Sequence, residues 1–152
     1  MCDYSLHHVA SRPARVGEVL VTAGFPGTHT RGFTSPSEAN VAVCLLPGTE
    51  IAFEENAKRD EFLIFKRSLR EKVARFRQVH LDMPYSHHDA LEFASGRVVL
   101  LTELSPGQRA TVLQLPSAGV RVELEETADR GIPVVETVAP RAAAAGRRAA
   151  AV

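Results

Sequence analysis

Residues 90–115, ALEFASGRVVLLTELSPGQRATVLQL, decide the fold class of this chain. The segment holds three short runs of strand length that are rich in aliphatic residues, at 90–93, 97–103 and 109–115. Ser95-Gly96 separates the first two runs, and Ser105-Pro106-Gly107-Gln108 separates the last two, as hairpin turns do. This spacing predicts a meander of short antiparallel strands.

Similar runs lie on both sides of this segment. Residues 120–125 (VRVELE) alternate strictly between apolar and polar, which is typical of a half-exposed strand. Residues 17–22, 40–46 and 51–53 also have strand composition, and Pro47-Gly48 between the last two suits a type II turn, so we expect these two strands to form a hairpin. Weaker strand signals lie at 31–34, inside a long Gly/Pro/Ser-rich loop, and at 132–138.

One stretch, residues 59–79, favours a helix. Its apolar side chains recur three or four residues apart and would form a single stripe, at Phe62, Phe65, Leu69, Val73 and Phe76. The end of the stretch, VARFRQVHL, also alternates as a strand would. We therefore predict an amphipathic helix over the first half and leave the second half open.

Together these elements predict a mainly β (α+β) fold. The expected architecture is a small antiparallel barrel or curled sheet with one amphipathic helix, because long helices do not alternate with the strands. Residues 1–139 would form a single β-rich domain. Residues 140–152, PRAAAAGRRAAAV, offer nothing to bury and are expected to be a disordered tail.

Composition limits the classes of partner. The 152 residues include 18 basic and 18 acidic side chains, so the chain has no general electrostatic attraction to nucleic acid or to an anionic membrane. The basic face between Arg67 and Arg77 is most simply a solvated surface. No apolar run has membrane-spanning length, and the N-terminus lacks the apolar core of a signal peptide. We expect a cytoplasmic protein whose two cysteines, Cys2 and Cys44, are free thiols.

The densest chemistry lies in residues 80–89, HLDMPYSHHD, where three of the six histidines and two aspartates fall within ten residues. Imidazole and carboxylate groups at this density can hold a transition metal or move a proton. The predicted ligands of a divalent zinc, iron or copper ion are His80, His87 and His88, with Cys2 as a fourth. If the site is catalytic, Asp89 or Glu92 would carry the proton. The alternative is a polar loop that binds no metal.

Cys2 supports a separate hypothesis. Removal of Met1 would leave a cysteine that bears both a thiol and the α-amine, the arrangement that N-terminal nucleophile amidohydrolases use. The resemblance to their openings is limited to the cysteine itself. Cys2 would then be a catalytic nucleophile, and the simplest alternative is an ordinary terminal residue.

Longer stretches resemble known groups of proteins. The opening MCDYSLHHVASRPARVGEVLVT, with AVCLLPGTEIAFE and SHHDALEFASGRVVLLTELSPGQRATVLQL, is similar to small uncharacterised proteins of soil proteobacteria, a resemblance that implies no activity. The turns in PGTEIAF and PGQRATVLQL resemble those of SH3-like barrels in ferrous-iron transport accessory proteins. His87-His88, Glu92 and Gly96 loosely resemble the cupin pattern, without the residue that separates the two cupin histidines.

The sequence thus predicts a small cytoplasmic metal-binding protein, which could be a metal-dependent enzyme acting on a small molecule. The first alternative is a non-catalytic accessory or interaction subunit that contacts a protein partner. The second is a thiol enzyme with Cys2 as its nucleophile. Three imidazoles at one point would favour the first hypothesis, and an exposed apolar patch would favour the interaction subunit.

Overall fold

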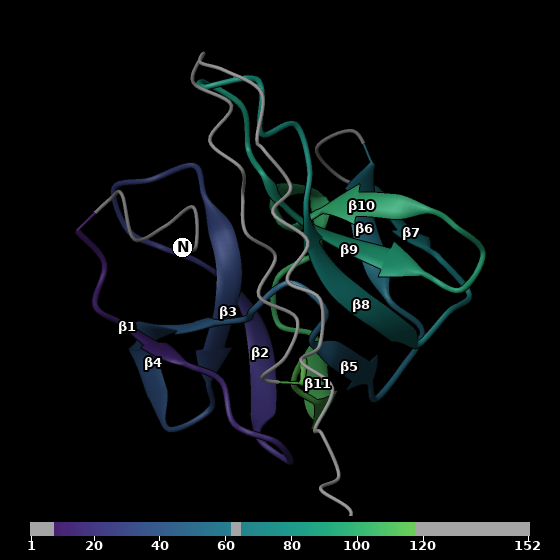
Figure 1. The fold of residues 1–152 in the computed structure, drawn as a ribbon, viewed down its shortest axis with the longest axis horizontal. Coiled ribbons are helices and arrows are strands. Elements are labelled where there is room, and N and C mark those ends of the chain that lie inside the picture. Colours follow the sequence, from purple (N-terminus) through teal and green to yellow (C-terminus); the bar gives the residue numbers. More distant parts are fainter. Residues whose placement is uncertain (1–7, 62–64, 118–152) are drawn as a thin grey trace, which may run out of the picture. The chain divides into compact units, whose positions relative to one another are not determined.

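The structure, a computed structural model, describes residues 8–61 and 65–117 (Figure 1). Strands dominate this part of the chain, and one short 3₁₀ turn, η3 (Leu101–Glu103), accompanies them. The strands are β1 (Ser11–Pro13), β2 (Val19–Gly24), β3 (Arg31–Ser35), β4 (Glu38–Cys44), β5 (Glu50–Phe53), β6 (Lys58–Glu61), β7 (Phe65–Ser68), β8 (Val73–Gln78), β9 (Asp89–Phe93), β10 (Val98–Leu100) and β11 (Arg109–Gln114). The prediction of a mainly β fold is confirmed.

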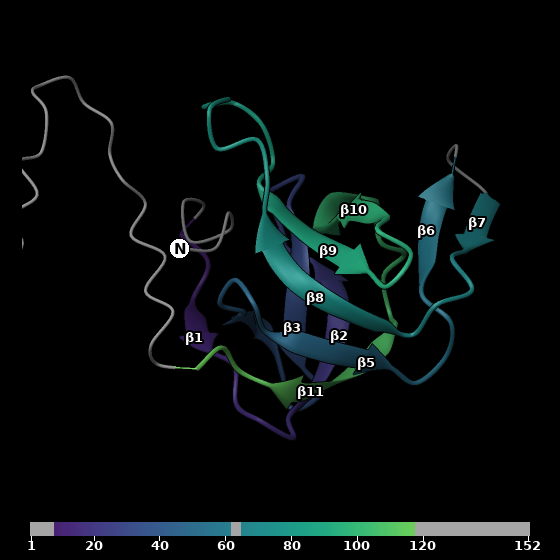
Figure 2. The same cartoon turned by 45° about the vertical axis from the view of Figure 1, so that its right-hand side comes forward.

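Nine of the strands form one sheet in the order β1-β4-β3-β2-β11-β5-β8-β9-β10. All neighbours are antiparallel except β1 and β4, which run parallel. The strands β6 and β7 form a separate two-stranded sheet. The large sheet has two edges, β1 and β10, and it does not close, so the predicted barrel is wrong. The strands β8 and β9 are visibly bent, and β6 and β7 lie beside them (Figure 2).

The predicted amphipathic helix is also wrong, because residues 59–79 contribute to three strands, β6, β7 and β8. The apolar side chains that suggested one stripe do not share one environment. Leu69 and Phe76 are buried, whereas Phe65 and Val73 are exposed. Burial in β8 alternates residue by residue, which is the period of a strand. Hence the alternation of apolar and polar residues in VARFRQ, and not the spacing of apolar residues by three and four, predicts the secondary structure of this region.

Turns near Gly48 and Gly107 join strands that do not pair with each other. Thr49 N donates to Leu46 O at 2.9 Å, and Gly48 has a φ of 95°, as a type II turn requires. Yet β4 pairs with β1 and β3, whereas β5 pairs with β8 and β11, so the predicted hairpin is wrong. Likewise the chain leaves β10 at Leu100, passes through η3 and the turn near Gly107, and enters β11, which pairs with β2 and β5 and not with β10. Only the Ser95-Gly96 turn closes a hairpin as expected, between β9 and β10.

The core consists of inward-facing side chains from nearly every strand of the large sheet. Its largest fully buried members come from β2, β3, β5, β8 and β9, namely Leu20, Phe33, Ile51, Phe76 and Leu91. Phenylalanine and aliphatic residues supply this volume, since the chain has no tryptophan. The packed sheet is the platform on which the loops described below are mounted.

Several sequence predictions lie outside the described residues: Cys2, the strands at 120–125 and 132–138, the C-terminal limit of the domain and the tail at 140–152. Among residues 8–61 and 65–117, no helix has the length and apolar character needed to cross a membrane.

Candidate functional site

The histidine cluster lies in the long loop of the β8–β9 hairpin, residues 79–88, which we call the β8–β9 loop. Gln78 and Asp89 form the last cross-strand pair, and Val79 N donates to His88 O at 2.8 Å just beyond it. Within the loop, Met83 N donates to His80 O at 2.9 Å. His80 has a φ of 54°, a left-handed conformation that ends the regular strand. The loop projects beyond the ends of β8 and β9 (Figure 2).

The structure places the three histidines near the base of this loop. His88 is half-buried, and its Nδ1 lies 3.0 Å from Val79 O. His87 is half-buried and His80 is exposed. Cross-strand pairing ends at Gln78–Asp89 and the Val79–His88 backbone bond, so His80 and His87 follow directly after the paired residues of the two strands. Nevertheless, the part of the chain that the structure describes contains no group of three His, Cys, Asp or Glu side chains that could hold a metal ion.

The two carboxylates predicted as proton carriers have partners within the β8–β9 hairpin. Asp89 is buried at the start of β9, and its Oδ1 accepts a hydrogen bond from Gln78 Nε2 at 3.2 Å. Glu92 is half-buried, and Arg77 Nη1 donates to its Oε2 at 2.7 Å. Both interactions hold β8 to β9. They therefore support the hairpin from which the loop projects.

Apolar side chains on the β8–β9 loop face solvent, which the sequence reasoning missed. Leu81 is 51% exposed, Met83 48% and Tyr85 102%. The sequence does contain these apolar residues close together, in Leu-Asp-Met-Pro-Tyr between His80 and His87. Single exposed apolar residues are common on protein surfaces, but three within five residues of a projecting loop form a local apolar surface.

A hollow of about 430 Å³ lies at the base of the same loop. Its apolar lining comes from Val79, Val98 and Leu100, and its polar lining from Arg77, His80 and Glu103. Val98 and Leu100 belong to β10, an edge strand of the large sheet. The loop and the hollow are therefore neighbours, because Val79 and His80 belong to both.

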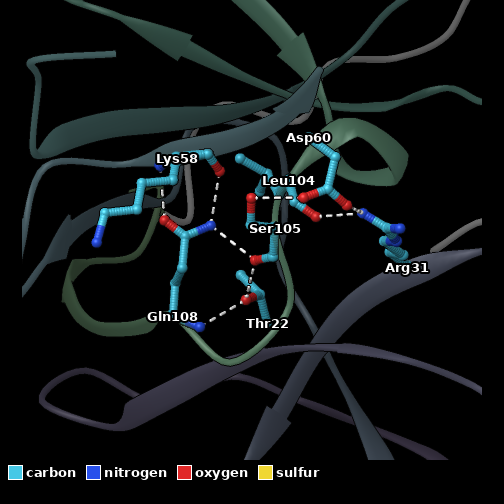
Figure 3. A network of polar contacts seen from close by, with 7 residues as sticks. All are labelled: Thr22, Arg31, Lys58, Asp60, Leu104, Ser105 and Gln108. Atoms are coloured by element: carbon cyan, nitrogen blue, oxygen red, sulfur yellow. Dashed lines mark hydrogen bonds and ion pairs between the residues drawn. The ribbon is translucent and has the colours of Figure 1, made fainter. Parts of the chain in front are cut away.

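A second polar cluster lies around the turn that precedes β11, and we call it the polar junction (Figure 3). Gln108 is its centre: Oε1 accepts from Lys58 N at 2.6 Å, while Nε2 donates to Lys58 O at 2.8 Å and to Ser105 O at 2.7 Å. The buried Thr22 hydroxyl donates to Ser105 O at 2.8 Å and accepts from Gln108 N at 2.9 Å. These bonds join β2, β6 and the turn.

The polar junction ends in an ion pair. Arg31 Nη1 donates to Asp60 Oδ2 at 2.5 Å and to Leu104 O at 2.6 Å, and Ser105 Oγ donates to Asp60 Oδ1 at 2.7 Å (Figure 3). The Ser105 hydrogen bond, followed by the Arg31 interaction, lowers the pKa of Asp60 below its ordinary value, although partial burial opposes the shift. Sequence reasoning could not find this cluster because its members lie up to 86 residues apart.

A hollow of about 290 Å³ adjoins the polar junction. Two of the cations in its lining already have acidic partners: Lys58 Nζ lies 2.8 Å from Glu55 Oε2, and Arg109 Nε lies 2.9 Å from Glu54 Oε1. Lys66 also lines the hollow, so charges of both signs border it. This hollow has no single sign of charge with which to select an ionic ligand.

Cys44, the last residue of β4, is half-buried and disulfide-bonded, so the expectation that it is a free thiol is wrong. The sequence has one other cysteine, Cys2, which lies outside the described residues. Disulfides are uncommon in reducing compartments.

The chain matches no protein-family model, and no curated protein or solved structure shows significant similarity to it.

Proposed function

We propose that this protein is a non-catalytic interaction subunit that contacts a protein partner through the β8–β9 loop. The observation that carries the proposal is the exposure of Leu81, Met83 and Tyr85 on a single projecting loop. Aromatic and methionine side chains are enriched where proteins bind one another, and Tyr offers a large contact area with few rotatable bonds. Loops mounted on a rigid sheet commonly carry such contacts.

The base of the loop supports this role. Three interactions fix the positions at which the loop leaves the sheet. They are the Arg77–Glu92 ion pair, the Gln78–Asp89 hydrogen bond and the Val79–His88 backbone hydrogen bond. A contact surface that is held in place before binding loses less conformational entropy on association. The imidazole of His88 takes part in the same support through Val79 O.

Site-specific photo-cross-linking tests the proposal. A benzophenone amino acid replaces Tyr85 in the full chain, and the same replacement at Val16, an exposed apolar residue in the turn before β2, is the matched control. We expect a discrete cross-linked protein species for the Tyr85 variant, suppressed by an excess of the unmodified chain and absent for the Val16 variant. Equal labelling at the two positions, or none at either, would contradict the proposal.

Transition-metal binding is the second candidate function, favoured by the presence of His80, His87 and His88 at the base of one loop. In this hypothesis Asp89 or Glu92 would move a proton if the metal were catalytic. Elemental analysis of untagged protein, purified without chelators, tests it. About one metal ion per chain that is lost in a His80/His87/His88→Ala variant would support metal binding. A metal-free wild-type chain would remove this candidate without affecting the interaction proposal.

A further inference from the structure

We propose that the Cys44 disulfide is a redox-sensitive switch that ties the N-terminus of the chain to β4, and that its reduction releases Val9 and Ala10 from β4. The sequence has one other cysteine, so a disulfide within the chain joins Cys44 to Cys2. The strand order of the large sheet begins with β1 and β4 and ends with β8, β9 and β10. The switch is therefore a different site from the β8–β9 loop.

The bonded cysteine lies where β4 holds the beginning of the chain. Cys44 is the last residue of β4 and pairs in register with Pro13 of β1. Its carbonyl oxygen accepts a hydrogen bond from Ala14 N at 3.0 Å, and Ala42 N donates to Ala10 O at 2.8 Å. These two bonds lie on either side of the three paired residues of β1. The bond to Ala10 is the one nearer to the N-terminus.

A small apolar cluster depends on the same segment. Phe25 and Ala42 are buried in it, and Val9 and Cys44 pack against them. None of these side chains belongs to the main core cluster. A satellite cluster of this kind can open without unfolding the core, at a fraction of the global free energy. Because Phe25 is only 4% exposed, release of Val9 would uncover an aromatic ring.

Arg12 limits how far the segment can open. Its Nη2 lies 2.5 Å from Glu18 Oε1, and its Nε donates to Glu38 Oε2 at 2.8 Å. The other Glu18 oxygen, Oε2, accepts from Arg15 N at 3.0 Å. None of these interactions involves sulfur, so they continue to hold β1 when the disulfide is reduced. The opening is thus confined to the residues that precede Arg12.

Thiol–disulfide exchange with a dithiol operates the switch. Cys44 is half-buried, so part of its surface is open to solvent. A thiolate of the dithiol attacks one sulfur of the disulfide and forms a mixed disulfide, which the second thiol of the reagent then displaces. The reagent becomes a disulfide, and its two electrons and two protons leave Cys2 and Cys44 as thiols. An oxidising environment keeps the segment tied, and a reducing environment releases it.

Amide hydrogen exchange, followed by nuclear magnetic resonance on the full chain with and without excess dithiothreitol, tests the switch. The Ala42 N–H should exchange at least about tenfold faster after reduction, because its acceptor on Ala10 is released. Two other amides are internal controls and should change by less than about twofold. They are Ala14 N–H, beyond Arg12, and Thr22 N–H, which donates to Gln108 O at 2.9 Å.

Two variants separate the disulfide from other effects of the reductant. Cys2→Ser, measured without reductant, should show the exchange pattern of the reduced chain while Cys44 stays in place on β4. Ser11→Ala, at an exposed position of β1, keeps both cysteines and should behave as the wild-type chain does. Peptide mapping by mass spectrometry under non-reducing conditions should identify a Cys2–Cys44 linkage within one chain.

Four results would overturn the switch. The first is an Ala42 exchange rate that is the same in the oxidised and reduced chains. The second is equal acceleration at Thr22, which would mean that reduction destabilises the whole fold. The others are a disulfide that excess dithiothreitol leaves intact and a linkage of Cys44 to a different chain.

Discussion

The polar junction and the β8–β9 loop use their side chains in opposite ways. In the junction, Gln108, Thr22 and Ser105 direct their polar atoms at other protein atoms, so the turn before β11 is held by side chains from several strands. In the loop, Tyr85 and Met83 face solvent, and backbone bonds supply the local structure. The side chains of the first region are engaged within the protein, whereas those of the second are available for contacts, so we expect stability to depend on the first region.

Removing the centre of the junction should have the largest effect on stability. Gln108→Ala removes the acceptor of Lys58 N and one donor each to Lys58 O and Ser105 O, which keep Ser105 N and the Thr22 hydroxyl as donors. We expect the free energy of unfolding to fall by about 2–3 kcal/mol. Urea denaturation measures it, with Gln114→Ala, at an exposed position of β11, as the control. A loss no larger than that of the control would show that these bonds are not needed.

The buried hydroxyl of Thr22 should contribute less. Thr22→Val preserves the shape of the side chain but removes the donor to Ser105 O and the acceptor for Gln108 N. We expect a loss of about 1–2 kcal/mol in the same urea measurement. Thr111→Val, at a half-buried position of β11, provides a comparison outside the junction. Equal losses for the two variants would count against a specific role for the junction.

Asp60 should make the junction sensitive to acid. Its pKa is lowered in the folded protein, so its contribution to stability is present above the unfolded pKa, about 3.9, and is lost as the pH falls through the folded value. We expect Asp60→Asn to be less stable than the wild-type chain at pH 7 and to lose less stability on acidification. Urea midpoints between pH 7 and pH 2 test this. Parallel pH curves for the two proteins would contradict it.

The loop substitutions should change stability least. Tyr85→Ala removes a fully exposed ring, so the free energy of unfolding should change by less than about 0.5 kcal/mol. Urea denaturation alongside Gln108→Ala gives the contrast directly. A loss for Tyr85→Ala as large as that of Gln108→Ala would show that the ring packs against the protein, and the two regions would then not differ.

Local patterns in the sequence predicted most of the strands but not their pairing. The runs at 17–22, 40–46 and 109–115 became β2, β4 and β11 because alternation and β-branched residues act locally. The pairing of β11 with β2 and β5 depends on contacts between distant segments, which no local pattern encodes. The helix prediction failed for the same reason: Phe65 and Phe76 have a helical spacing, but tertiary packing buries only Phe76.

The sequence placed the candidate site at residues 80–89, and all of these except Asp89, the first residue of β9, lie in the β8–β9 loop. Whether the histidines converge on a metal could not be judged from spacing, because it depends on the conformation of the loop, in which His80 is left-handed and His88 contacts Val79 O. The exposure of Tyr85 was equally hidden, since an aromatic residue in a sequence is as consistent with a core as with a contact surface.

The central claim is that the β8–β9 loop serves association and not folding. The most direct test is the association of Tyr85→Ala, measured by sedimentation for self-association and by competition against the cross-linked partner if that partner is another protein. The account predicts at least about tenfold weaker association, as expected for loss of an aromatic anchor, with an unchanged free energy of unfolding. Unchanged association of a fully folded Tyr85→Ala variant would contradict it.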